Sequence, residues 1–187
     1  MVFVDPLTIM LVAVAASASL IAIYLISQAL GKKIAEELAM PGFFIGVFDF
    51  LSGFFMSFSW PLPGAYNILF GDPMLFLGII MLAGSYMLYK KISLRYMPIL
   101  GFLLGIYLLV ETYGIATLNL ESGKYFMPAF SFYLFSTISA LLSPIASLDP
   151  KKYKYAYHFL AALLILTALL AMFIGCGGIY EHLASPP

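Results

Sequence analysis

The chain has 187 residues, of which 63% are hydrophobic and only 10% charged, and its formal net charge is zero. Soluble domains carry about 25% charged residues, so this composition excludes a soluble globular protein and requires the lipid bilayer as the main solvent. The neutral charge gives no reason to expect nucleic acid as a partner. The single cysteine, Cys176, excludes an internal disulfide, and we interpret it as a small apolar packing residue.

Six apolar segments have the length of membrane-spanning helices, which need about 20 residues. They cover residues 6–30, 41–60, 73–89, 97–119, 128–147 and 157–180. The third segment is short, and we expect the apolar stretch before it to add depth. Pro144 is expected to kink or end the fifth span, because proline removes a backbone donor from a helix. The predicted fold is all-α, a polytopic transmembrane bundle of six spans forming a single domain over residues 1–187.

The basic residues divide the connections into two sets. Eight of the nine lie in the connections that follow the first, third and fifth spans, and Lys124 is the exception. These eight are Lys32, Lys33, Lys90, Lys91, Arg95, Lys151, Lys152 and Lys154. The positive-inside rule makes that face cytoplasmic, which predicts both termini outside in a multi-pass protein of the plasma membrane.

Small residues form stripes along several predicted spans. In the second span Gly42, Gly46, Asp49 and Gly53 share one helical face. Helices associate in lipid through such small residues, which let their backbones approach closely. The fifth span carries a serine face, made of Ser136, Ser139, Ser143 and Ser147. We expect a compact bundle whose interior is lined by small and hydroxyl side chains.

Two carboxylates fall inside predicted spans, Asp49 in the second and Glu111 in the outer half of the fourth. Acidic groups at such depth are costly and are either functional or structurally paired. No basic residue lies at the depth of Asp49, so it is expected to be protonated or hydrogen-bonded, with the serine face of the fifth span as a donor set. For both residues a titrating site and a structural cross-link remain open.

The segment between the second and third spans is the most unusual part of the sequence. Its prolines and glycines forbid a continuous helix, and Gly71, Asp72 and Pro73 are typical of a turn, a helix cap and a first helical residue. Apolar non-helical backbone at a membrane surface must pack against protein or line a cavity. We therefore expect a binding lid or vestibule at the outer mouth, or else a rigid turn. The candidate binding residues are Trp60, Pro61, Pro63, Gly64, Tyr66, Asn67, Gly71, Asp72 and Pro73.

The run from Trp60 to Pro73, WPLPGAYNILFGDP, resembles the signature of domain-of-unknown-function family 981, a set of small multi-span membrane proteins of archaea and bacteria. In the family pattern a threonine precedes the tryptophan and a serine follows the glycine, where this chain has Ser59 and Ala65. The resemblance implies that this segment matters, and it implies no particular activity.

Three functional hypotheses follow. The first is a transporter or channel-like protein for a small or proton-coupled solute, with Asp49 titrating, Glu111 as an outer relay and residues 60–73 as the outer gate. The second is a non-catalytic subunit of a larger, for example respiratory, membrane complex, in which small-residue stripes dock partner helices or a second copy. The third is a quinone- or lipid-binding intramembrane protein, which includes an intramembrane enzyme. We identify no catalytic motif and no metal site, assign no cofactor, and favour a non-enzymatic role.

Overall fold

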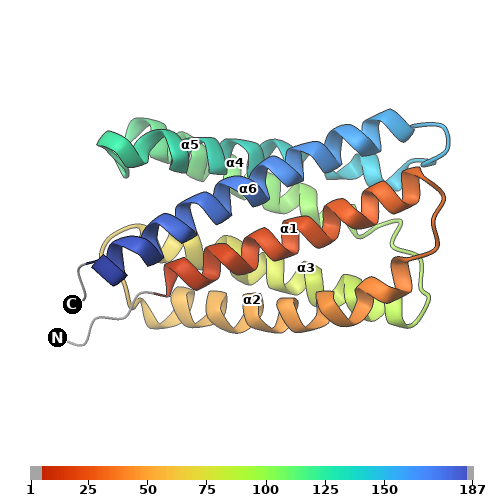
Figure 1. Cartoon of the computed structure of the whole chain (residues 1–187), viewed down its shortest axis with the longest axis horizontal. Helices are drawn as coiled ribbons and strands as arrows, with labels where there is room; N and C mark the ends of the chain where they lie inside the picture. The colour runs from red at the N-terminus through yellow and green to blue at the C-terminus, as the bar shows by residue number, and fades with distance from the viewer. Residues whose placement is uncertain (1–5, 185–187) are drawn as a thin grey trace.

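The structure is a computed structural model, and residues 6–184 are described here. Six long helices run back and forth along one axis (Figure 1), and in the described residues no strand accompanies them. They are α1 (Leu7–Ala29), α2 (Ala39–Ser59), α3 (Asp72–Tyr89), α4 (Pro98–Thr117), α5 (Phe126–Leu141) and α6 (Lys154–Ala184). With their flanking turns, all six are long and apolar enough to cross a membrane. The predicted all-α, six-span bundle is confirmed.

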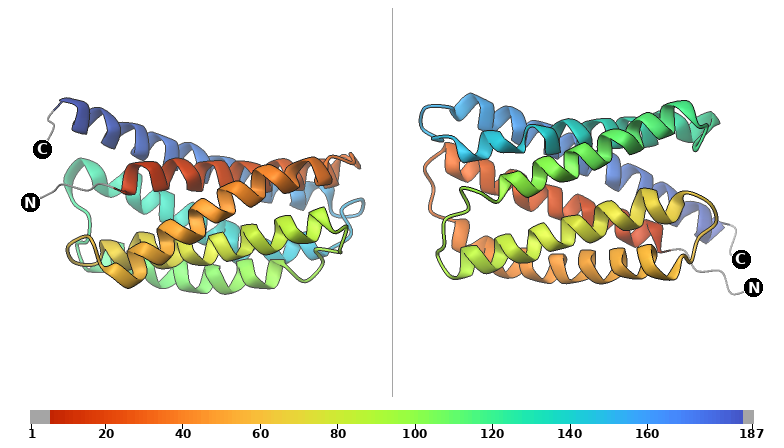
Figure 2. Two further views of the ribbon diagram at one scale, coloured as in Figure 1. Left: turned by 90° about the horizontal axis from the view of Figure 1, so that it is seen from below. Right: turned by 180° about the vertical axis from the view of Figure 1, so that it is seen from behind.

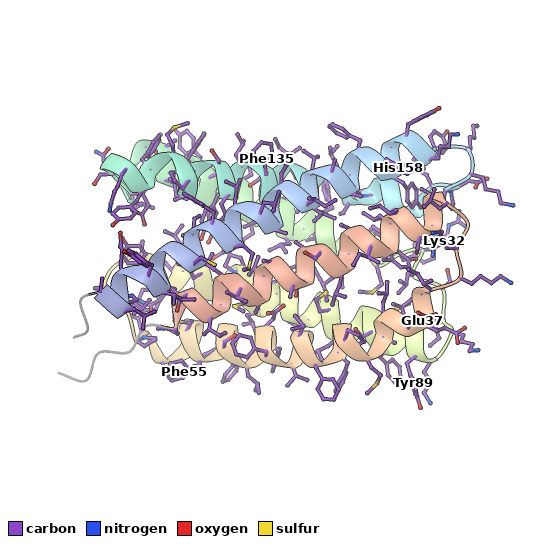
Figure 3. The ribbon with its side chains drawn as sticks, in the orientation of Figure 1. Lys32, Glu37, Phe55, Tyr89, Phe135 and His158 are labelled. Carbon is purple, nitrogen blue, oxygen red and sulfur yellow. The ribbon has the colours of Figure 1, made fainter. Side chains whose placement is uncertain are left out.

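The start of α1 and the end of α6 lie at the same end of the bundle, here called the terminal end. The opposite end, here called the lysine end, holds the connections that carry eight of the nine basic residues. Lys32 and Tyr89 are labelled there in Figure 3. Tyrosines accompany the charges, and the Lys90 ammonium lies 5.5 Å from the centre of the Tyr89 ring. Tyrosine and lysine side chains both favour a membrane–water interface.

Short helical turns adjust several predicted span boundaries. A π-helical turn, η2 (Asn67–Gly71), runs directly into α3, so the third span gains the depth that its sequence predicted. Later in the chain, α5 ends at Leu141 and a 3-10 turn, η4 (Ser143–Ser147), follows. Pro144 lies in this turn, which confirms that it ends the fifth helix. Two further 3-10 turns, η1 (Ala35–Leu38) and η3 (Gly123–Tyr125), precede α2 and α5.

The helices associate as three closely packed pairs, α1 with α6, α2 with α3 and α4 with α5 (Figure 2). Glycine makes the closest contacts possible. A Cβ atom on Gly53 of α2 would lie 2.2 Å from the backbone nitrogen of Leu75, and one on Gly78 of α3 would lie 2.3 Å from that of Phe50. In the α4–α5 pair, a Cβ atom on Gly105 would lie 2.6 Å from the nitrogen of Leu141. These backbones touch, as small residues in membrane helices allow.

The predicted stripe on α2 is confirmed, because Gly42, Gly46, Asp49 and Gly53 are all buried. The phenylalanines on the other faces of α2 remain exposed, for example Phe55, labelled in Figure 3. The interpretation of Cys176 is wrong, since its side chain is exposed on α6. The neighbouring Gly175 is the residue buried against α1, and position 176 therefore faces away from the bundle.

Candidate functional site

A cavity of about 450 Å³, here called the chamber, lies between the three helix pairs. All six helices contribute to its wall. It extends from Leu11 and Phe70 in the terminal half of the bundle to Ser93 and Arg95 in the connection between α3 and α4 at the lysine end. Its volume is in the range of small-molecule sites, about 300–1,000 Å³. Because its lysine-end residues include exposed connection residues, the chamber reaches the surface at that end.

Most of the chamber wall is aliphatic or aromatic, and hydroxyl groups are spaced along it. Several of these hydroxyls already donate their hydrogen to the backbone. Ser136 and Ser139 donate to the carbonyl oxygens of Phe132 and Phe135, both at 2.7 Å. Ser143 donates across to α4, to the carbonyl oxygen of Pro98 at 2.7 Å. The predicted serine face of the fifth span therefore lines the chamber.

A second, smaller cavity of about 270 Å³, here called the terminal cavity, lies at the terminal end of the bundle. It is lined by the first turns of α1, the last turns of α6, Tyr66 and Glu121. Burial raises the pKa of Tyr66, and the charge of Glu121 and a hydrogen bond to it add to this effect. Leu11 and Phe70 line both cavities. The chamber and the terminal cavity therefore adjoin at these two side chains, here called the partition.

The candidate binding segment is irregular only over its first part. Trp60 ends α2 in the left-handed conformation, with φ of 49°, and Gly64 makes a second left-handed turn with φ of 58°. The fully buried Asn67 holds the loop, because its Oδ1 accepts from the backbone nitrogen of Leu62 at 2.9 Å and its Nδ2 donates to the oxygen of the same residue. These two hydrogen bonds replace backbone pairing that the prolines prevent.

The expected turn and helix cap at the end of this segment are wrong. Gly71 is helical, and Asp72 follows within the same continuous helix instead of capping its start. The carboxylate of Asp72 accepts a hydrogen bond of 2.6 Å from the hydroxyl of Tyr107 on α4. A glycine is needed at position 71 for packing, since a Cβ atom there would lie 2.8 Å from that of Met56 on α2.

The segment also shapes the partition. The hydroxyl of Tyr133 on α5 donates to the backbone oxygen of Leu69. The ring of Phe70 meets that of Tyr133 edge to face, with centroids 6.2 Å apart, and it stacks on Tyr66 at 6.4 Å. Of the candidate residues, Tyr66 lines the terminal cavity and Pro73 the chamber. Trp60, Pro61, Pro63, Gly64, Asn67, Gly71 and Asp72 line neither, and they act on the cavities only through the shape of the loop.

Asp49 is fully buried between α2 and its neighbours. The Ser17 hydroxyl of α1 donates to its Oδ2 at 2.6 Å, while its Oδ1 has no partner in the part of the chain that the structure describes. The predicted hydroxyl donor is therefore present, but assigning it to the serine face of the fifth span is wrong. That face is turned toward the chamber and α4, and Asp49 does not line the chamber.

Glu111 is buried in α4, with 7% of its surface exposed. Neither of its carboxylate oxygens has a hydrogen-bond partner among the described residues. Glu111 and Asp49 lie on separate helices without a mutual contact, and neither lines a cavity. Across residues 6–184, no group of three or more His, Cys, Asp or Glu is placed to hold a metal ion.

Sequence reasoning did not identify the residues that shape the cavities, namely Leu11, Gln28, Phe70, Arg95 and Tyr133. Leucine and phenylalanine are everywhere in this chain, so nothing in the pattern distinguishes two partition residues from lipid-facing ones. Arg95 carried a usable signal, because it is the single arginine among nine basic residues. Arginine is favoured over lysine where a planar group must bind an anion.

A family model described as "Protein of unknown function (DUF981)" matches residues 1–185, which confirms the resemblance seen in the residue 60–73 segment. No curated protein matches the chain, and no solved structure matches it either.

Proposed function

Since the chain belongs to the family described as "Protein of unknown function (DUF981)", which brings no activity with it, we propose its function from the arrangement of its cavities. We propose that the protein is a membrane carrier for a small, largely apolar solute. The chamber is the binding site, the lysine end is the open side, and the segment of residues 60–73 holds the closed side.

The observation that carries this proposal is the partition. The chamber and the terminal cavity follow one another along the bundle axis, and Leu11 and Phe70 line both of them. A single layer of side chains therefore separates the chamber from the terminal cavity. A carrier needs this arrangement, because its binding site must open to one side of the membrane at a time.

Phe70 is suited to act as the movable part of the partition. It lies in the π-helical turn η2, and π-helical turns are frequent at functional sites. One end of this turn follows the loop that Asn67 fixes, and Tyr133 binds its middle through the backbone oxygen of Leu69. Rotation of one aromatic ring, held between Tyr66 and Tyr133, would join the two cavities.

The geometry favours this function over the two alternatives. A complex subunit would need no chamber, yet all six helices contribute to one. A static lipid- or quinone-binding protein would need the chamber but not the terminal cavity behind Phe70. This second alternative keeps one supporting observation, because Tyr66 lines an apolar cavity next to Trp60's loop. The proposed carrier does not use Asp49 or Glu111, since neither reaches the chamber.

Thiol labelling from each side of the membrane tests the carrier. The native Cys176 is replaced by serine, and Ser136 in the chamber wall becomes the single cysteine (Ser136→Cys). A small, polar but uncharged, membrane-impermeant thiol reagent should label it from the lysine end only. Adding Phe70→Ala should open the partition and permit labelling from both ends. The unmodified chain is the control, because Cys176 is exposed within the apolar span of α6 and lines neither cavity, so the reagent should not label it from either side.

Two results would refute the carrier. Labelling of Ser136→Cys from both ends without the Phe70 change would mean an open channel and no partition. Labelling from neither end, with or without Phe70→Ala, would mean that water does not reach the chamber.

A further inference from the structure

The polar groups of the chamber are distributed unevenly. Four side-chain donor groups line its lysine end and have no hydrogen-bond partner within residues 6–184: those of Tyr24, Gln28, Ser85 and Arg95. Ser85 is the most telling, because only 5% of the residue's surface is exposed, yet its unpaired hydroxyl is not enclosed by protein and stays accessible at the chamber wall. Buried polar groups are normally hydrogen-bonded, and exceptions at a cavity wall indicate a site for a ligand atom or a water molecule.

The middle of the chamber offers nothing comparable. Ser136 and Ser139 have donated their hydrogens to α5 itself, and Thr167 donates its own to the oxygen of Leu163 at 3.1 Å. The hydroxyl of Tyr133 donates to the backbone oxygen of Leu69, and the rest of the wall up to Phe70 is apolar. A charged group in this middle region would lose its hydration without gaining a donor, which is unfavourable.

Charge follows the same gradient. The lysine end carries eight of the nine basic residues and only three of the nine acidic ones, Glu36, Glu37 and Asp149. Glu36 is paired with Lys91 at 3.1 Å. Arg95 has no carboxylate partner among the described residues, and its guanidinium lies 5.9 Å from the centre of the Tyr96 ring. No acidic residue lines the chamber.

We infer that the chamber binds an amphiphile with an anionic headgroup, the headgroup held by Arg95, Ser85 and Gln28 at the lysine end and the apolar part directed toward Phe70. The inference rests on the proposed function in one respect, that the chamber is a ligand site. The positive-inside rule alone accounts for exposed lysines at this end. It does not account for unpaired donors in the wall of an apolar cavity.

Direct binding to the whole protein, in nanodiscs of zwitterionic phosphatidylcholine, tests the inference. The probes are radiolabelled palmitate, hexadecyl phosphate and hexadecanol, which share one chain and differ in headgroup. We expect saturable binding of at least one anion, about tenfold tighter than that of the alcohol. Arg95→Gln should weaken anion binding about tenfold and leave the alcohol unchanged. Lys90→Gln is the matched control, because Lys90 shares the charged end but does not line the chamber.

A second pair of variants locates the ligand. Gly84 lines the chamber and has open space where a side chain would be, so Gly84→Leu should fill the chamber without disturbing the helix. Gly177 also has open space but lines neither cavity, and Gly177→Leu is its control. Gly84→Leu should abolish binding of every probe, whereas Gly177→Leu should not change it.

The outcomes separate the two proposals. Equal binding of anions and alcohol, lost in Gly84→Leu but unaffected by Arg95→Gln, would overturn the anionic headgroup and leave the chamber as a ligand site. Saturable binding that survives Gly84→Leu would place the ligand elsewhere and overturn both proposals. Absence of saturable binding by all three probes would overturn the inference that the chamber binds an amphiphile.

Discussion

The bond between Ser17 and Asp49 joins α1 to α2, two helices from different pairs. Because Asp49 does not line the chamber, we predict a structural role for it. Asp49→Asn keeps an acceptor for the Ser17 hydroxyl and should leave stability and ligand binding unchanged. Asp49→Ala removes the acceptor and should lower the unfolding free energy by about 1 kcal/mol, as polar contacts between membrane helices do. Denaturation in detergent micelles measures both variants.

A double variant provides the control for this prediction. Ser17→Ala combined with Asp49→Ala should cost little more than Asp49→Ala alone, since the two residues share the bond. Loss of transport or binding in Asp49→Asn, with stability retained, would contradict the structural role and restore Asp49 as a titrating group.

For Glu111 we predict a different effect, because its carboxylate is buried without a hydrogen-bond partner in residues 6–184. Burying a polar group without a hydrogen bond is unfavourable, so Glu111→Leu should raise the unfolding free energy by about 1–2 kcal/mol. Glu111→Gln keeps the shape of the side chain and should gain less. Denaturation compares the two variants with the unmodified protein, and a loss of stability in Glu111→Leu would show that the carboxylate has a partner in the membrane. If the gain in stability came with a loss of transport, Glu111 would be retained for function.

Among the elements, the loop after α2 and the turn η2 act as one unit whose shape depends on Asn67. Its amide satisfies both backbone groups of Leu62. Asn67→Ala should therefore speed hydrogen exchange at the Leu62 amide by about tenfold or more, because the amide would no longer be protected by its hydrogen bond to the Asn67 side chain. Exchange in nanodiscs, read by mass spectrometry, measures this. Ser122→Ala, in another connection at the terminal end, is the control and should leave the exchange rate at Leu62 unchanged. Equal rates in the unmodified protein and both variants would contradict the role of Asn67 in holding the loop.

The helices can be predicted from the sequence, but the distances between the helix pairs cannot. Apolar length and proline placement predicted all six helices and the end of α5 near Pro144, and glycine spacing predicted the buried face of α2. The helical state of Gly71 was missed, because it depends on contact with Met56 of α2, which local turn preference does not include. The chamber was also missed. Its existence depends on how far apart the three pairs lie, and no single helix encodes that separation.

In the whole molecule, tight pairs and a loose centre arise from one cause. Glycines bring helices into backbone contact within the α2–α3 and α4–α5 pairs. Between pairs the helices are in less extensive contact, and the α3–α4 contact is slight. In lipid no hydrophobic force closes such a gap, because lipid tails are as apolar as leucine. The same residues that make each pair rigid therefore leave a chamber among the pairs.

The sidedness of the molecule gives the last prediction. Because eight of the nine basic residues lie at the lysine end, the positive-inside rule predicts that this end faces the cytoplasm. Lys124, at the opposite end, opposes this orientation only weakly, because it is paired with Glu181 at 3.0 Å. In a Cys176→Ser background, a membrane-impermeant thiol reagent should label Ser122→Cys on intact cells and Ser93→Cys only in inverted vesicles. Labelling of both cysteines from one side would mean that α4, the span between residues 93 and 122, does not cross the membrane. The chamber would then be wrong as well, since α4 contributes to its wall.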